Sequence, residues 1–169
     1  MDYVFEPLSQ DHNRAAFSCG VEPLDRYVRQ QASQDIRRRV AAVFVAHESM
    51  SNVVCGYYTL SAFGINPVSL PTEITRRLPR YDSLPATLVG RLAVDQDQQG
   101  QGLGRQLLMD ALERSLQATE QIASMAVVVD AKDDAARRFY ERFGFQRFLD
   151  NDYRLYIPMA TVGQLRLKA

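Results

Sequence analysis

Three glycines alternate with other residues in the run Gln99-Gly100-Gln101-Gly102-Leu103-Gly104. The apolar segment 88–94 before this run predicts a strand, and the segment 105–112 after it predicts a helix. A glycine-rich turn at a helix N-terminus suits a pyrophosphate, because the first helical N–H groups lack intrahelical partners and the helix dipole adds partial positive charge. Glycines also let the backbone approach phosphate oxygens closely. The turn therefore predicts that the chain binds a phosphorylated cofactor.

Two well-known nucleotide-binding turns fit this run less well. A dinucleotide-binding βαβ unit would place the turn near its start, whereas roughly ninety residues precede this one. Asp130, at the end of the next predicted strand, does lie at about the distance that such a unit requires. A P-loop needs a Lys-Ser/Thr pair, which does not follow Gly104. For the glycines taken alone, a tight structural turn between strand and helix remains the alternative.

A second motif, about forty residues further on, changes that balance. Gln99-x-x-Gly102-x-Gly104 is similar to the Gln/Arg-x-x-Gly-x-Gly/Ala pattern of the GNAT acetyltransferases. The segment 135–145, Ala-Ala-Arg-Arg-Phe-Tyr-Glu-Arg-Phe-Gly-Phe, resembles the late Ala-x-x-x-Tyr-x-x-x-Gly-Phe element of the same family. Together the two motifs are a much more specific signal than either one alone.

The resemblance extends to the toxin branch of that family, the TacT-like acetyltransferase toxins of type II toxin–antitoxin modules. The similarity runs from about Leu8 to Ile157. Five more segments carry it, namely 17–25, 56–60, 78–81, 90–95 and 129–133. The resemblance implies a protein that uses acetyl-CoA to acetylate the α-amino group of aminoacyl-tRNA and so blocks translation. It also implies a small ribbon-helix-helix antitoxin as partner and a homodimer.

The resemblance further implies where acetyl-CoA binds. Backbone N–H groups from Gln99 to Arg105 would hold the pyrophosphate, and the edge of the strand Leu92–Val94 would pair with the pantetheine arm as an added strand does. An N–H group near Ala93 or Val94 would face the developing oxyanion. The complete set of expected cofactor-binding residues is Leu92, Ala93, Val94, Gln99, Gly100, Gly102, Leu103, Gly104, Arg105, Asp130 and Ala136.

Tyr140 is the candidate general acid. A phenol, with a pKa near 10, stays protonated at neutral pH yet can protonate a thiolate whose reference pKa is near 8.5. Core packing is the alternative role, because Ala136, Phe139, Tyr140 and Phe143 share helical spacing. The acidic residues Asp95, Asp130 and Glu141 are expected to be solvated or to cap helices rather than to act as bases. An α-amino ester is largely neutral at physiological pH, so water can accept its proton.

Arginines form the second functional clue, as candidate tRNA-binding residues. They are Arg37 and Arg38 at the end of an early helix, Arg76, Arg77 and Arg80 in a proline-rich segment, and Arg91 in a strand. The first two clusters would bind phosphates if they share one face, whereas the alternative is a solvated helix end. Arg91 needs a partner inside a strand. Tyr57, Tyr58 and Tyr81 could stack on a terminal adenine, or the two strand tyrosines could pack in the core.

These residues must be positioned by alternating strands and helices. The sequence predicts an α/β protein with a mixed central sheet of roughly six to seven strands flanked by about four helices, which in this family is the GNAT fold. Expected strands are 3–8, 41–46, 53–61, 88–94, 126–129, 145–149 and 153–158. Expected helices begin near 22 and cover about 73–78, 104–118 and 133–143, the last ending at Gly144.

Composition bounds the remaining possibilities. The 169 residues carry 20 basic and 20 acidic side chains, so nucleic-acid binding must rest on local patches, and we expect one domain over 1–169. No apolar run reaches about 18 residues and the start lacks a signal-peptide pattern, which predicts a cytoplasmic protein that does not enter the membrane. Cys19 and Cys55 are expected to be free, small and buried. Zinc is not expected, since His12 and His47 cluster with neither cysteine.

Three hypotheses follow. The leading one is an acetyl-CoA-dependent toxin that acts on charged tRNA. The second is a GNAT that acetylates a protein N-terminus or a small amine, which an acidic or apolar acceptor cleft would favour. The third is a CoA-binding regulatory protein without turnover, against which Tyr140 and the complete glycine turn argue. Basic patches beside the acceptor site favour the first hypothesis.

Overall fold

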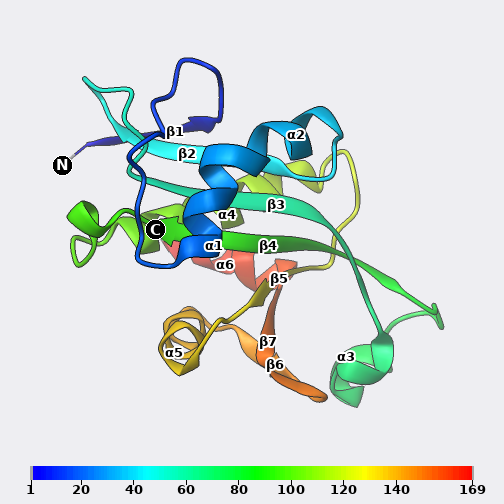
Figure 1. The fold of residues 1–169 in the computed structure, drawn as a ribbon. Helices are drawn as coiled ribbons and strands as arrows, with labels where there is room; N and C mark the ends of the chain where they lie inside the picture. The colour runs from blue at the N-terminus through cyan, green and yellow to red at the C-terminus, as the bar shows by residue number, and fades with distance from the viewer. Residues whose placement is uncertain (1, 169) are drawn as a thin grey trace. The chain divides into compact units, whose positions relative to one another are not determined.

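A seven-stranded mixed sheet organises the chain, in the hydrogen-bonded order β1-β2-β3-β4-β5-β7-β6 (Figure 1). The structure is a computed structural model that describes residues 2–168, with side chains described to residue 165. The strands are β1 Tyr3–Pro7, β2 Ala42–Glu48, β3 Gly56–Ile65, β4 Leu84–Val94, β5 Ala126–Asp130, β6 Gln146–Phe148 and β7 Asn151–Pro158. β4 and β5 pair in parallel, whereas β1–β2, β2–β3, β5–β7 and β6–β7 pair antiparallel. The α/β fold class with a mixed sheet is therefore confirmed.

The helices are α1 Glu22–Arg26, α2 Ala32–Arg37, α3 Thr72–Thr75, α4 Leu103–Ala118, α5 Asp134–Arg142 and α6 Met159–Lys168. A π-helical turn, Tyr27–Gln31, joins α1 to α2, and short 3₁₀ turns cover Pro67–Ser69 and Gln96–Gln98. Within residues 2–168, no helix is both long and apolar enough to cross a membrane.

The chain divides into two compact units. The first comprises the residues up to Ser61 together with Gly90–Ala111, and the second comprises Ala62–Val89 together with the residues from Leu112 onward. Each unit has its own apolar core, one built around Tyr57 and the other around Tyr156.

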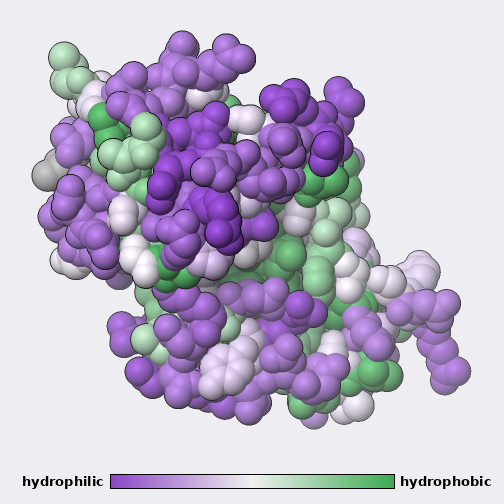
Figure 2. Space-filling view, viewed as in Figure 1, coloured by the Kyte–Doolittle hydropathy of each residue, from purple (hydrophilic) through white to green (hydrophobic). Residues whose placement is uncertain are grey.

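In the first unit, helical elements pack on both faces of β2 and β3. The α1–α2 segment lies across these strands (Figure 1), and its Tyr27 and Val28 share a core cluster with Tyr57. Successive strand residues point to opposite faces, so Gly56 faces away from the α1–α2 segment and toward α4. A Cβ atom added at Gly56 would lie 2.8 Å from Leu107 Cδ1 of that helix. The outer surface of the α1–α2 segment is hydrophilic in Figure 2.

In the second unit, β5 is a run of three valines, 127–129, each fully buried, as expected for a strand covered on both faces. The helix α5 begins at Asp133, whose side chain accepts the Ala136 N–H at 2.8 Å, and it stops before Gly144 at φ +98°. The predicted helix 133–143 with its stop at Gly144 is therefore confirmed to within one residue at each end, and Asp133 serves as its N-cap.

Several boundaries differ from the prediction, and one helix was missed. β3 continues past Ser61 to Ile65, and β4 begins at Leu84, ahead of the predicted Leu88. Pro85 is tolerated near the start of β4 because its carbonyl still accepts the Met125 N–H at 2.9 Å. The C-terminal helix α6 was not predicted, because its stability comes from burying Met159 and Val162 rather than from a capping signal.

Candidate functional site

The predicted glycine turn connects β4 to α4 in the first unit. Gly100 and Gly102 have φ angles of +80° and +85°, in the left-handed region where side chains other than glycine are strained. A Cβ atom at either position would meet nothing within 4 Å, so the space beside the turn is open. These two glycines therefore satisfy a backbone requirement and also leave room for a ligand to approach.

The same turn presents unused hydrogen-bond donors. Within the described chain, the backbone N–H groups of residues 100–104 donate to no other protein group. They precede and open α4, where the helix dipole adds positive potential. The predicted residues from Gln99 to Arg105 thus lie together in one turn that can accept an anion such as a pyrophosphate.

The side chain of Gln99 has a role that the sequence did not reveal. Its Nε2 donates to the carbonyl of Cys19 at 3.0 Å and to that of Val94 at 2.9 Å. The amide therefore ties the turn to the end of β4 and to the segment before α1. The backbone N–H of Gln99 donates to the Gln96 carbonyl at 3.4 Å, so the uncommitted donors of the turn begin at Gly100. A polar residue directly before a glycine turn was the one available signal for such a brace.

Asp95 braces the same region. Its carboxylate accepts N–H groups of Ser18 and Asp97, each at 3.0 Å, and its own N–H donates to the Cys55 carbonyl at 2.8 Å. The expectation that Asp95 caps rather than acts as a base is thus supported. Just before it, Ala93 is buried in the core while Leu92 and Val94 are half-buried.

Tyr140 lies on α5 in the second unit, one turn after Ala136, and exposes only 7% of its surface. Its ring contacts Phe139 and Phe145, with centroids 5.2 and 5.5 Å away. Burial, with a smaller contribution from the Asp130 charge, raises the pKa of Tyr140 to about 12. Its hydroxyl has no hydrogen-bond partner among the described residues. The phenol is therefore protonated at neutral pH and has no competing protein acceptor.

Asp130 and Glu141, the other two acidic residues considered above as bases, are both paired with arginines. Asp130 receives two hydrogen bonds from Arg154, Nε to Oδ1 at 2.8 Å and NH2 to Oδ2 at 3.3 Å. Glu141 lies 3.3 Å from Arg147 and 3.6 Å from Arg137. Both carboxylates are thus engaged by arginine side chains, which agrees with the expectation that they have structural rather than catalytic roles.

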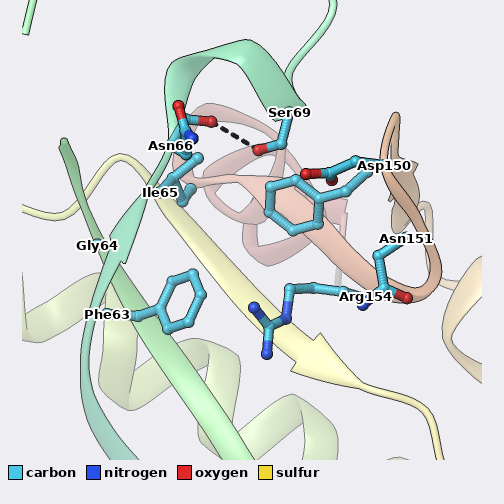
Figure 3. Close-up of a pocket in the computed structure, with 9 residues that line it drawn as sticks. Phe63, Gly64, Ile65, Asn66, Ser69, Asp150, Asn151 and Arg154 are labelled. Atoms are coloured by element: carbon cyan, nitrogen blue, oxygen red, sulfur yellow. Dashed lines mark hydrogen bonds between the residues drawn. The ribbon is translucent and has the colours of Figure 1, made fainter. Parts of the chain in front are cut away.

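A polar cavity of about 210 Å³ lies beside Arg154 (Figure 3). Arg154 reaches into it from β7, with its guanidinium carbon 5.0 Å from the centre of the Phe63 ring on β3. The turn from β6 to β7 contributes Asp150. The cavity thus presents one positive and one negative group, and no sequence motif identified it because its residues come from separate parts of the chain.

The two arginine clusters are exposed, each in its own unit. Arg37 and Arg38 lie at the C-terminal end of α2. In the second unit, Arg76 and Arg80 line an apolar cavity of about 300 Å³, and Tyr81 beside them is 59% exposed. Among described residues, none of these four arginines has a carboxylate within ion-pair distance. Such uncompensated charges can bind phosphates.

The second cluster also includes Arg77, which is exposed directly after Arg76. Arg91, by contrast, is half-buried on β4. Its partner is an aromatic ring rather than a carboxylate: the guanidinium carbon lies 3.6 Å from the centre of the Tyr27 ring. The face of the Tyr27 ring therefore stabilises the Arg91 charge on β4 through a cation–π contact.

For Tyr57 and Tyr58 the structure supports the packing alternative and not base stacking. Both side chains are fully buried, with 0% exposure. The Tyr57 hydroxyl donates to the Leu24 carbonyl at 2.7 Å, and the Tyr58 hydroxyl donates to Asp110. Of the three tyrosines considered, only Tyr81 is accessible. Neither cysteine forms a disulfide in the described part of the chain, as expected, although Cys19 is half-buried rather than buried.

Comparisons with known proteins agree with this geometry. The family described as acetyltransferase (GNAT) domain matches residues 39–147. The chain is 30% identical over 170 residues to a probable toxin TacT of Sinorhizobium fredii, covering 96% of this chain and 94% of that protein. It is 35% identical over 139 residues to a tRNA-acetylating toxin of Mycobacterium tuberculosis, covering 82% and 81%. The solved structure of AtaT complexed with acetyl-methionyl-tRNAfMet matches with a TM-score of 0.91 at 26% identity, covering 98% and 99%.

Proposed function

Since the chain belongs to the GNAT family of acetyltransferases, we propose that it is an acetyl-CoA-dependent N-acetyltransferase toxin. Its acceptor is the α-amino group of aminoacyl-tRNA, and acetylation of that group blocks translation. The observation that carries the proposal is the likeness, over most of the chain, to relatives named as toxins, one of them tRNA-acetylating. The whole of 1–169 acts as one acetyltransferase domain.

The glycine turn is the proposed site for the pyrophosphate of acetyl-CoA. The unused N–H groups of residues 100–104 and the open space beside Gly100 and Gly102 fit such an anion. The backbone of Gln99 and Arg105 completes the turn, and the strand segment Leu92–Val94 is the proposed edge for the pantetheine arm. Asp130 and Ala136 complete the proposed cofactor-binding set. When bound, acetyl-CoA supplies the acetyl group as a thioester.

Tyr140 is the proposed general acid. Its raised pKa keeps the phenolic proton in place at neutral pH, and its hydroxyl is not committed to another described group. A sulfur leaving group, as it gains negative charge, would take that proton. No carboxylate is assigned as the base, because the attacking α-amino ester is already largely neutral and can release its proton to water.

The exposed arginines are the proposed contacts to tRNA phosphates. Arg37 and Arg38 belong to the first unit, and Arg76, Arg77 and Arg80 to the second. Arg91 would contribute from its half-buried position on Tyr27. Tyr81 is the exposed ring available to stack on an unpaired base.

The proposed partners follow from the toxin assignment. A small ribbon-helix-helix antitoxin that also binds DNA would neutralise the enzyme, and the toxin itself would be a homodimer in the cytoplasm, where charged tRNA is used. A gene for a small basic ribbon-helix-helix protein directly upstream would support the toxin assignment. Its absence would weaken that assignment and leave the acetyltransferase activity standing.

The deciding experiment uses purified protein, labelled acetyl-CoA and bulk aminoacyl-tRNA, with deacylated tRNA as control and Tyr140→Phe beside the wild type. Label on charged tRNA alone, strongly reduced in the variant, would support both the acceptor and the role of Tyr140. Turnover on peptides or small amines without label on tRNA would replace the toxin with the alternative acceptor class. No turnover on any amine would point to a CoA-binding regulatory protein.

A further inference from the structure

Both histidines of the chain meet on one carboxylate in the first unit. The Nε2 atoms of His12 and His47 lie 2.8 and 2.7 Å from Oε1 of Glu6. Glu6 pairs with Val45 across β1 and β2, so His47, two residues further along β2, lies on the same face of the sheet as Glu6. His12 reaches the same point from the loop after β1. The three ligand-type atoms all lie within 4.8 Å of one another.

The other nitrogen of each ring is held by the backbone. Nδ1 of His47 donates to the carbonyl of Glu48 at 2.8 Å. Nδ1 of His12 accepts the N–H of Ser9 at 3.0 Å and lies 3.4 Å from the Ser9 hydroxyl. His47 therefore has the arrangement that orients imidazole ligands at metal sites, in which Nδ1–H donates to a local partner while Nε2 points to a shared centre.

Burial and charge single out this cluster from ordinary surface acidic groups. Each histidine exposes only 9% of its surface, whereas the Glu6 side chain is 43% exposed and leaves an entry path. In the described chain, Glu6 has no lysine or arginine partner; its ion-pair contacts are the two imidazoles. Positive charge at the centre is therefore supplied only by protons on the rings.

We propose that Glu6, His12 and His47 form a binding site for one divalent transition-metal ion, with zinc the best match. Two imidazole nitrogens and one carboxylate oxygen are a borderline ligand set that suits Zn²⁺, with solvent completing the tetrahedron. This site is independent of the proposed acetyl transfer.

Metal binding requires two changes in the cluster. The ligand atoms must separate to about 3.3 Å, the spacing that bonds of about 2.0–2.1 Å impose at a tetrahedral centre. Rotation of the exposed Glu6 carboxylate can provide this separation. Each Nε2 must also offer a lone pair: His47 keeps its proton on Nδ1, toward Glu48, and His12 carries its proton on Nδ1. There the Ser9 hydroxyl must replace the Ser9 N–H as the partner of Nδ1, which the local backbone has to allow by turning that N–H away.

The composition of the chain makes the site testable, because it has only two histidines and two cysteines. Full-length protein without a histidine tag is dialysed, its metal content is measured, and zinc is titrated by calorimetry. We expect one saturable zinc per chain. His12→Gln and His47→Gln should each abolish it, whereas the control Cys19→Ser/Cys55→Ser should retain it. Melting curves establish that each variant is folded, and Glu6→Gln provides a third, more exposed ligand variant.

Cobalt titration provides a second readout. Co²⁺ in this site should give visible absorption typical of tetrahedral nitrogen and oxygen ligands, without a thiolate band. Absence of saturable zinc binding would overturn the proposal and leave a hydrogen-bonded proton network. Binding that survives both histidine variants, or that disappears with the cysteine variant, would overturn it as well.

Discussion

The guanidinium carbon of Arg91 lies 3.6 Å from the centre of the Tyr27 ring. Tyr27 is held from both sides, since its hydroxyl donates to Asp35 at 2.8 Å and its ring stacks on Tyr57 with centroids 6.1 Å apart. A half-buried cation on the sheet is thus balanced by an aromatic face. The contact links β4, which leads into the glycine turn, to the helical segment around Tyr27.

Removing this cation should weaken the first unit. We expect Arg91→Ala to lower the free energy of unfolding by about 0.5–2 kcal/mol, the range for a partly desolvated cation–π contact. Arg91→Lys should recover only part of that loss, because an ammonium lacks the planar stacking surface. Denaturant unfolding monitored by circular dichroism measures the difference. Equal stability of wild type and Arg91→Ala would show that the contact contributes nothing.

Tyr140→Phe should separate chemistry from stability. Loss of a general acid typically lowers turnover by about 10²–10⁴-fold. The melting temperature should hardly change, because the hydroxyl has no partner among the described residues. The matched control is Tyr156→Phe, which removes a buried hydroxyl that donates to Gln146 at 3.1 Å. Full turnover in Tyr140→Phe, or an equal loss in the control, would exclude the proposed role.

The raised pKa of Tyr140 also predicts how stability depends on pH. The pKa is about 12 in the folded protein and about 10 when the chain is unfolded, so below pH 10 both states keep the proton. Between pH 10 and 12 the unfolded state ionises first, and stability should fall by up to about 2–3 kcal/mol. Unfolding of wild type and Tyr140→Phe at pH 9 to 12 isolates this contribution. Parallel pH curves would mean that the phenol titrates normally.

Two glycines of the turn should respond differently to alanine. Gly102→Ala places a side chain at φ +85°, which costs about 1–2 kcal/mol and should weaken acetyl-CoA binding as the turn relaxes. Gly104→Ala should be tolerated, because its Cβ would meet Val94 Cγ2 at an ordinary 3.7 Å. Calorimetry with acetyl-CoA, together with melting curves, compares the two variants. The reverse order of effects would contradict a left-handed turn at Gly102.

The arginines of the second unit should determine how tRNA affinity responds to salt. Replacing Arg76, Arg77 and Arg80 by glutamine should reduce the magnitude of the slope of log affinity against log salt concentration by up to about 2–3. Each phosphate contact contributes about 0.7–0.9 to that slope. Filter binding over a salt series measures the slope. Arg26→Gln, an exposed arginine outside the proposed set, is the control. An unchanged slope in the triple variant would remove these residues from the interface.

Local patterns predicted much of the fold correctly. The valine run of β5, the leucine spacing of α4 and the Asp133 and Gly144 ends of α5 are all signals contained within a few neighbouring residues. Elements stabilised by distant contacts were missed: α6 depends on the burial of Val162, and the start of β4 on a bond between Pro85 and Met125.

In the candidate site, too, features set by neighbouring residues were predicted and features that depend on distant contacts were missed. The glycine turn and Tyr140 follow from spacing, whereas the brace formed by Gln99 needs the Cys19 carbonyl, eighty residues earlier in the chain. Strand tyrosines such as Tyr57 are compatible with either face of a sheet, and only the packed helices decide that it is buried. His12 and His47 are too far apart in sequence for ligand spacing to reveal their meeting on Glu6.

The π-helical turn Tyr27–Gln31 sets the register between α1 and α2. Such a turn holds one residue more than an α-helical turn, because its hydrogen bonds run from residue i to residue i+5. Because each α-helical residue advances by about 100° around the axis, the wide turn is what lets Tyr27 at its start and Ala32 just after it, five residues further on, both face the core. Deleting one residue from the turn itself would let it close to an ordinary α-helical turn and would keep the register of the helix after it. Deleting one residue after the turn, within α2, would instead rotate the arginine-bearing end at Arg37 by about a quarter of a circle, so a change in chain length there can reorient a charged surface without altering a single arginine.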